Sequence, residues 1–144
     1  MVERKDGATI MSIKKAKQII KTGEAFISTP YVYGAESGRV DRFDCSSFVQ
    51  YVYATHGISL PRTSRQQFQV GDPIPLASVR RGDLLFFTTP KRGKLKGNKR
   101  IGHVAIFIGN NSILHTSRVE KKVAIAPLHP YWKTKIVGAR RVLA

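Results

Sequence analysis

The sequence predicts an α+β fold in which N-terminal helices pack on one face of a C-terminal antiparallel sheet of about five strands. Apolar residues recur at helical spacing in the first half of the 144-residue chain. Beyond residues 73–75, which include two prolines, the apolar segments become short and are separated by turn residues. Helices followed by strands are typical of α+β domains, and the lack of sequence repeats or long linkers favours a single domain.

The first predicted helix follows an arm of residues 1–12, and the single domain occupies residues 13–144. Ser12 is placed as the N-cap, since its hydroxyl can accept a hydrogen bond from a free amide of the first turn. The helix is expected to stop at residues 28–30, where a proline appears. Its stripe at helical spacing comprises Ile13, Ala16, Ile20, Gly23 and Ile27.

Two further helices are predicted before the strands begin. Asp44 is suited to cap the second helix, and Gly57 is placed as its C-cap because glycine adopts the left-handed conformation without strain. Thr63 or Ser64 is expected to cap a short third helix that runs through Phe68.

Five strands are predicted in the second half, each short and rich in apolar residues. A stretch at 91–100, between the first two of them, holds six basic residues and two glycines and is interpreted as a mobile, solvated loop. The predicted strands are Leu84–Thr88, His103–Ile108, Ser112–Thr116, Val123–Ala126 and Ile136–Val142.

The charge balance indicates which partners the surface attracts. Against 9 acidic residues stand 25 Lys and Arg, a formal net charge of +16. Such a field attracts nucleic acid, anionic lipid or an acidic wall polymer, without defining any chemistry. No apolar run approaches the roughly 20 residues of a membrane-spanning helix, and the charged N-terminus lacks the apolar stretch of a secretory signal.

Cys45 is the only cysteine, so an internal disulfide is excluded. With Asp44 as N-cap, accepting from the amide of Ser46 or Ser47, Cys45 lies in the first helical turn, where free amides and the helix dipole favour a thiolate. The charge of Asp44 opposes this, so a cationic partner, such as an imidazolium, is expected beside the sulfur. A core cysteine would occupy the apolar stripe of the helix, which Cys45 precedes. Cys45 is therefore the candidate nucleophile.

Two of the four histidines are candidates for the partner. His56 lies roughly 16 Å along the same helix and is excluded, and His129 falls in a predicted loop. His103 and His115 lie on consecutive strands joined by residues 109–111. A three-residue loop would place both on one face, whereas a two-residue turn would place them on opposite faces. On one face, His103 serves as general base and His115 orients its ring.

Six segments resemble, in order, the NlpC-type cell-wall cysteine peptidases, and the resemblance covers roughly residues 13–143. Each is weakly diagnostic alone, whereas the ordered series is specific. The segments are Pro30–Gly34, Phe43–Val49, Leu60–Ser64, Arg81–Phe87, Gly102–Gly109 and Ile113–His115.

This resemblance implies a papain-like fold and a catalytic triad of Cys45, His103 and His115. It implies hydrolysis of peptidoglycan stem peptides between D-γ-glutamate and the following diamino acid, at an extracellular, cell-wall or periplasmic location. A monomer is expected, with no metal or cofactor. Tyr31 matches a family tyrosine that contacts the substrate or the oxyanion. Asp44 and Ser46 match positions that hold the substrate's free amine or backbone.

Three alternatives stay open at this point. The same chemistry could act on another γ-glutamyl polymer such as poly-γ-glutamate, which suits so basic a protein. The basic stretch at 91–100 could belong to a nucleic-acid-binding module, although no zinc-finger, phosphate-loop or helix-turn-helix signature accompanies it. The two histidines and Cys45 could instead bind a metal. Arg62 and Arg65 could pair with substrate carboxylates, but neither is assigned to the site.

Overall fold

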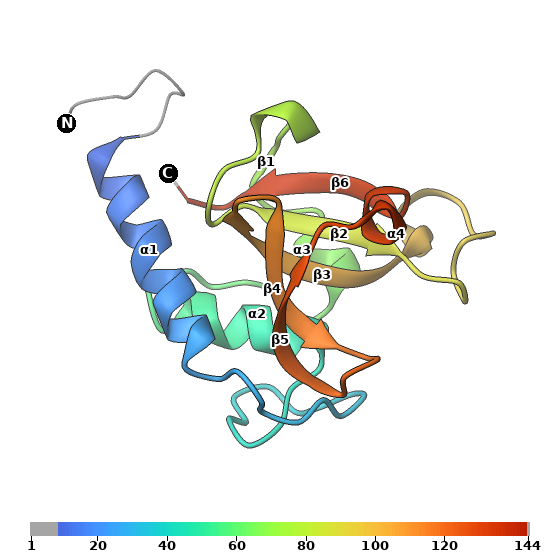
Figure 1. Cartoon of the computed structure of the whole chain (residues 1–144), viewed down its shortest axis with the longest axis horizontal. Helices are drawn as coiled ribbons and strands as arrows, with labels where there is room; N and C mark the ends of the chain where they lie inside the picture. The colour runs from blue at the N-terminus through green and yellow to red at the C-terminus, as the bar shows by residue number, and fades with distance from the viewer. Residues whose placement is uncertain (1–8, 144) are drawn as a thin grey trace.

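The computed structural model describes residues 9–143 and contains helices packed against an antiparallel sheet (Figure 1), which confirms the α+β prediction. Six strands follow the order β1-β6-β2-β3-β4-β5, and every neighbouring pair is antiparallel. All five predicted strands are present, and β1 is an additional two-residue edge strand. The elements are α1 (Ile10–Glu24), α2 (Cys45–Ala54), α3 (Ser64–Gln67), β1 (Asp72–Pro73), η1 (Leu76–Ser78), β2 (Leu84–Thr88), η2 (Gly97–Arg100), β3 (Ile101–Gly109), β4 (Ser112–Ser117), β5 (Lys122–Pro127), α4 (Pro130–Lys133) and β6 (Ile136–Arg141).

The start of α1 differs from the prediction. Thr9 is the N-cap, and Ser12 is the third helical residue, whose hydroxyl accepts from the Thr9 amide at 3.1 Å while its own amide donates to the Thr9 hydroxyl at 3.0 Å. This reciprocal pair explains why Ser12 resembled a cap. The placement of residues 9–12 in the arm was therefore wrong, and residues 1–8 lie outside the described part of the chain. Ile27 lies beyond the helix end and is exposed.

Two residues that the sequence singled out cap the starts of α2 and α3. Asp44 caps α2, as predicted, and Thr63 rather than Ser64 caps α3; each residue forms a reciprocal capping box. The C-cap of α2 is Thr55 rather than Gly57. Gly57 does adopt a left-handed conformation, with φ of 79°, but in the turn that follows the helix.

The sheet has a buried core on each face. Helices α1 and α2 cover one face, where Phe48 and Val52 meet Phe86 and Leu114. Gly23 permits close approach of α1, because a Cβ there would lie 2.7 Å from Leu114 Cδ2. The opposite face carries a smaller cluster that includes Leu85, Phe87, Ala105, Ile113, Leu128 and Ala139, with Trp132 of α4 packed against it.

The hairpin between β3 and β4 has a two-residue turn, not the predicted three-residue loop. Asn110 and Asn111 both have positive φ, 49° and 55°, and Gly109 pairs with Ser112. Successive residues with positive φ are characteristic of the type I′ turn, which asparagine tolerates.

A β-bulge compensates for this shorter turn. The register shifts between Phe107 and Gly109, after which Ile106 pairs with Leu114. Because the bulge adds one residue to β3, the side chain of every residue before it points to the opposite face of the sheet from the one that the turn alone would give. His103 and His115 consequently share a face, although the turn alone would have separated them. The predicted loop was wrong, whereas the predicted facing of the two histidines is confirmed.

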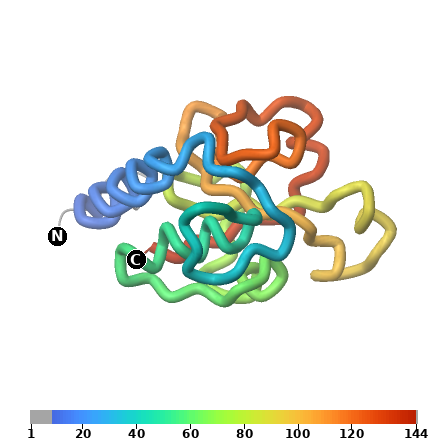
Figure 2. Tube along the Cα trace, turned by 90° about the horizontal axis from the view of Figure 1, so that it is seen from below, coloured from blue at the N-terminus to red at the C-terminus, as the bar shows by residue number. Residues whose placement is uncertain are grey.

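Residues 91–100 form a long loop that projects at the end of the molecule opposite α1 (Figure 2). The loop includes the short helix η2. Among residues 9–143, no helix is both long and apolar enough to cross a membrane.

Candidate functional site

Cys45 is the first residue of α2, where the cap fixes its position. The Asp44 carboxylate accepts from the Ser47 amide at 2.8 Å, and the Ser47 hydroxyl accepts from the Asp44 amide at 2.9 Å. Of the two amides considered from the sequence, the structure selects that of Ser47. Cys45 is 7% exposed and lines a cleft of about 660 Å³. The predicted nucleophile therefore lies at a helix start and at the wall of a cleft.

The sulfur of Cys45 lies where two strands separate. Among the described residues, the pairing of β3 with β4 ends at Ile106 and Leu114, while β4 stays paired with β5 as far as Ser117. The backbone N–H of Val104, in the part of β3 that pairs with β2 but not with β4, hydrogen-bonds to Cys45. Because β3 and β4 separate here, the backbone N–H of the residue that follows His103 is available to donate to the thiol.

His103 and His115 form a buried pair. Their Nε2 and Nδ1 atoms lie 2.9 Å apart, and each residue is 2% exposed. The other ring nitrogen of His103, Nδ1, is buried and has no hydrogen-bond partner among residues 9–143. A buried nitrogen without a partner is costly unless it serves a function. The predicted contact between the two rings is present, and it leaves one nitrogen of His103 available to act as a base.

Trp132 contacts both histidines of the pair, and the sequence analysis did not identify it. Its ring stacks on His103 with centroids 5.4 Å apart and an interplanar angle of 24°. It meets His115 edge-on, with centroids 5.5 Å apart. Phe87 contacts His103 from another side. Trp132 is the only tryptophan in the chain, but nothing in its sequence position links it to strands β3 and β4.

The electrostatics favour a neutral thiol and a neutral imidazole. Burial raises the pKa of Cys45 and the charge of Asp44 raises it further, against smaller opposing effects of the Val104 amide and Arg118. Burial lowers the pKa of His103 well below its usual value, and His115 and Arg118 act in the same direction. These directions favour a neutral pair over the expected thiolate beside an imidazolium, because desolvation opposes charge on both groups.

Arg118 is a second residue that the sequence reasoning missed. It follows β4, donates to the carbonyl of Gly102 at 2.8 Å and hydrogen-bonds to Tyr31. Burial raises the pKa of Tyr31, with Arg118 partly opposing this, so the phenol stays protonated at neutral pH. Arg118, Tyr31 and Cys45 all line the cleft.

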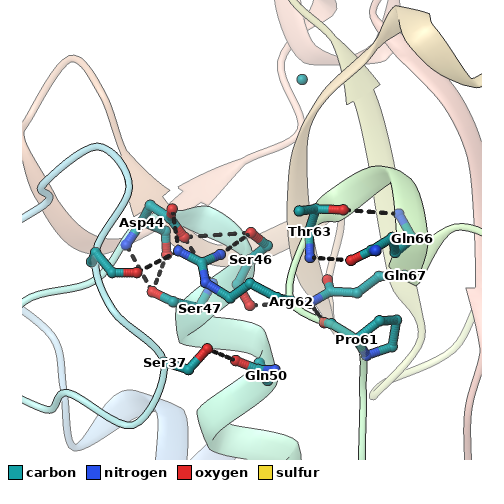
Figure 3. A network of polar contacts seen from close by, with 12 residues as sticks. Ser37, Asp44, Ser46, Ser47, Gln50, Pro61, Arg62, Thr63, Gln66 and Gln67 are labelled. Carbon is teal, nitrogen blue, oxygen red and sulfur yellow. Dashed lines mark hydrogen bonds and ion pairs between the residues drawn. The ribbon is translucent and has the colours of Figure 1, made fainter.

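Asp44 and Ser46 are linked by Arg62, as Figure 3 shows. The Arg62 guanidinium donates to the Asp44 carboxylate at 2.7 Å and to the Ser46 hydroxyl at 2.8 Å, and it also bonds the carbonyl of Ala35. The predicted contact residues Tyr31, Asp44 and Ser46 thus lie in the same cleft as Cys45. Arg62, left unassigned from the sequence, holds two of them in place.

The other two histidines lie elsewhere. His56 Nε2 contacts the Thr22 hydroxyl of α1 at 2.8 Å, and His129 is exposed before α4. Within the described residues, no group of three or more His, Cys, Asp or Glu is arranged to hold a metal ion.

Protein stability is expected to fall as the pH is lowered from about 6.5 towards 4, because of His115. Burial lowers the pKa of His115 to about 4, against 6.5 when unperturbed. Between these values the unfolded chain binds a proton that the folded protein excludes, so acid favours unfolding. The full difference corresponds to roughly 3 kcal/mol. Urea unfolding at a series of pH values measures it, and His115→Asn should show a shallower dependence. An unchanged slope in that variant would contradict this assignment.

Comparison with known proteins gives a consistent result. The NlpC/P60 family model matches residues 28–141. The chain is 36% identical over 129 residues to a gamma-D-glutamyl-L-lysine dipeptidyl-peptidase of Bacillus cereus, covering 89% of this chain and 37% of that protein. It is 36% identical over 121 residues to the murein DD-endopeptidase MepH of Escherichia coli, covering 81% of this chain and 42% of that protein. The matched region is thus less than half the length of either relative.

A solved structure extends the similarity to three dimensions. An NlpC/P60 family protein from Bacillus cereus superposes with a TM-score of 0.79 at 36% identity, covering 90% of this chain and 40% of that one. The predicted papain-like arrangement of helices on an antiparallel sheet is confirmed by this match.

Proposed function

The chain belongs to the NlpC/P60 family, and from that membership and the cleft geometry we propose that it is a cysteine peptidase acting on peptidoglycan stem peptides, with Cys45 as nucleophile. The observation that carries the proposal is that Nδ1 of His103 is buried and has no hydrogen-bond partner among the described residues. The other ring nitrogen of His103 contacts His115, and the next residue of the same strand, Val104, contacts Cys45 through its backbone. A nucleophile, a base and a group that orients the base are the parts that thiol peptidases require.

The reaction begins from the neutral pair. As Sγ of Cys45 attacks the scissile carbonyl, its proton passes to Nδ1 of His103. The Nε2–H of His103 donates to Nδ1 of His115, which fixes the tautomer and spreads the developing positive charge. The imidazolium then protonates the leaving amine, and the remaining thioester is hydrolysed by a water that His103 deprotonates.

The tetrahedral oxyanion needs donors close to the sulfur. The Tyr31 phenol lines the same cleft and remains protonated, so it can donate there. The free backbone N–H groups in the first turn of α2 are further donors, aided by the helix dipole. Tyr31 therefore has the role of an oxyanion or substrate contact.

The bond cleaved is assigned to that between D-γ-glutamate and the following diamino acid. Support comes from the name of the Bacillus cereus relative, which specifies a γ-D-glutamyl linkage. The Asp44 carboxylate and the Ser46 hydroxyl, both in the cleft, are suited to hold the free amine or backbone on the N-terminal side of that bond. Such a substrate places the site of action in the cell wall or periplasm.

Digestion of defined muropeptides, read by mass spectrometry, tests both the activity and the bond. We expect a product that ends in D-glutamate and a second that begins with the free amine of the diamino acid. Release of fragments from cleavage at another bond would correct the assignment. Intact muropeptides after prolonged incubation would contradict the proposed function.

A further inference from the structure

Three arginines from separate parts of the chain converge on one backbone segment at the cleft. Arg65 of α3 donates to the carbonyl of Ile101 at 3.0 Å, and Arg92 of the 91–100 loop donates to that of Lys99 at 3.1 Å. Arg118, after β4, donates to the carbonyl of Gly102 at 2.8 Å. All three arginines line the cleft that contains Cys45. We call Arg65, Arg92 and Arg118 the arginine cluster.

The positive charge of this cluster is not neutralised by neighbouring carboxylates. Among residues 9–143, no carboxylate lies within 4.0 Å of any of the three guanidiniums. The one acidic residue that lines the cleft is Asp44, and its carboxylate is paired with Arg62. Lys91 adds a further positive charge to the lining. The cleft is therefore strongly cationic beside the proposed nucleophile.

The packing around Gly102 brings the loop against the start of β3. A Cβ at Gly102 would lie 2.6 Å from the Thr89 hydroxyl and 3.2 Å from Cδ of Arg92. The lack of a side chain there lets the stem of Arg92 lie against the strand. Residues 91–100 are largely exposed, as interpreted from the sequence, and Lys91, Arg92 and Leu95 also form part of the cleft wall.

Anchoring by a carbonyl leaves most of a guanidinium available. Each guanidinium has five N–H donors in a planar fork, and the carbonyl contact uses few of them while it restricts the orientation of the group. Oriented guanidiniums bind carboxylates with paired, charge-assisted hydrogen bonds. A set of carbonyl-anchored arginines with no carboxylate partner is thus organised to receive an anionic ligand.

We propose that the arginine cluster binds a free carboxylate of the substrate, distinct from the group held by Asp44 and Ser46. This inference rests on the proposed function and names its substrate class: stem peptides in which the diamino acid keeps a second, unamidated carboxylate. Arg118 contacts Tyr31 and influences Cys45, so it also takes part in the chemistry. Arg65 and Arg92 are the members whose substitution isolates carboxylate recognition.

The test compares two peptides that differ in one group. One is L-Ala-γ-D-Glu-meso-diaminopimelate, and the other is the same peptide with the side-chain carboxylate of the diamino acid amidated. The wild-type protein should cleave the first with a kcat/KM about tenfold or more above the second, chiefly through KM. In the Arg65→Gln and Arg92→Gln variants, the ratio of the two kcat/KM values should fall towards one. Lys94→Gln removes an equal charge from the same loop, outside the cleft lining, and should keep the preference.

Several outcomes would overturn the inference. Equal cleavage of the two peptides by wild-type protein would reject the carboxylate subsite without contradicting the proposed peptidase function. An equal loss of preference in Lys94→Gln would reduce the effect to general electrostatic steering. Cleavage of neither peptide would contradict the proposed function, and binding of both to Cys45→Ala protein by calorimetry would then decide the subsite. Equal affinities there would reject it, and tighter binding of the unamidated peptide would support it.

Discussion

Replacing Cys45 with alanine is expected to reduce turnover of stem peptides by at least about a thousandfold. The change removes the sulfur that attacks the carbonyl, while its small volume at the helix start leaves α2 and its cap intact. His103→Ala should cause a loss of similar size, because the base and the nucleophile act as a unit. His129→Ala is the matched control, since that histidine is exposed before α4 and should leave turnover unchanged. Steady-state kinetics on a muropeptide measures all three, and an active Cys45→Ala protein would reject the mechanism.

The protonation state of Cys45 can be tested independently of the substrate. Because burial and Asp44 raise its pKa above the usual 9.0, little thiolate exists at neutral pH. Alkylation by iodoacetamide, which labels this single cysteine, should be slow at pH 7 and should accelerate as the pH rises past 9. A fast rate that persists down to about pH 5 would indicate a thiolate–imidazolium pair and contradict the neutral starting state.

Replacing Asp83 with alanine is expected to destabilise the fold by about 3–5 kcal/mol. Asp83 is 1% exposed, and its carboxylate accepts from Arg141 at 2.9 and 2.8 Å and from the Arg80 amide at 2.8 Å. These contacts join the start of β2 to the end of β6. Removing the carboxylate takes away the negative charge that Asp83 places against the largely buried Arg141 guanidinium, which costs more than the lost attraction alone.

The matched control for this prediction is an exposed ion pair. Asp41 binds Arg39 at 2.7 Å, but its side chain is 54% exposed, so water and salt screen the interaction. Asp41→Ala should therefore change the urea midpoint little. Equal destabilisation by Asp83→Ala and Asp41→Ala would show that burial does not determine the contribution of Asp83.

The secondary structure could largely be predicted from local signals. Asp44 and Thr63 occupy cap positions because a short acceptor side chain satisfies amides within its own turn, which needs no distant partner. Strand β2 matches its predicted bounds because a short apolar segment between turn residues is a local pattern. Ser12 misled the prediction of α1 because both partners of a capping box are hydroxyl residues three positions apart, and either could be the cap.

The hairpin shows where local signals stopped being sufficient. Asn110 and Asn111 could have indicated a two-residue turn, since both tolerate positive φ. No local pattern reveals the bulge between Phe107 and Gly109, because it depends on how β3 pairs with both of its neighbours. A correct turn without the bulge would have placed His103 and His115 on opposite faces. The facing was predicted correctly through a loop that the structure does not contain.

For the site itself, the sequence alone determined the candidate nucleophile, its cap and the two histidines, because residue type and position along an element carry that information. The tertiary structure decided which groups surround them. Trp132 stacks on His103 from a helix after β5, and Arg65, Arg92 and Arg118 meet at residues 99–102 from three separate parts of the chain. It also sets the direction of the pKa shifts of Cys45 and His103, because desolvation depends on everything packed around a group and no neighbour in sequence can report it.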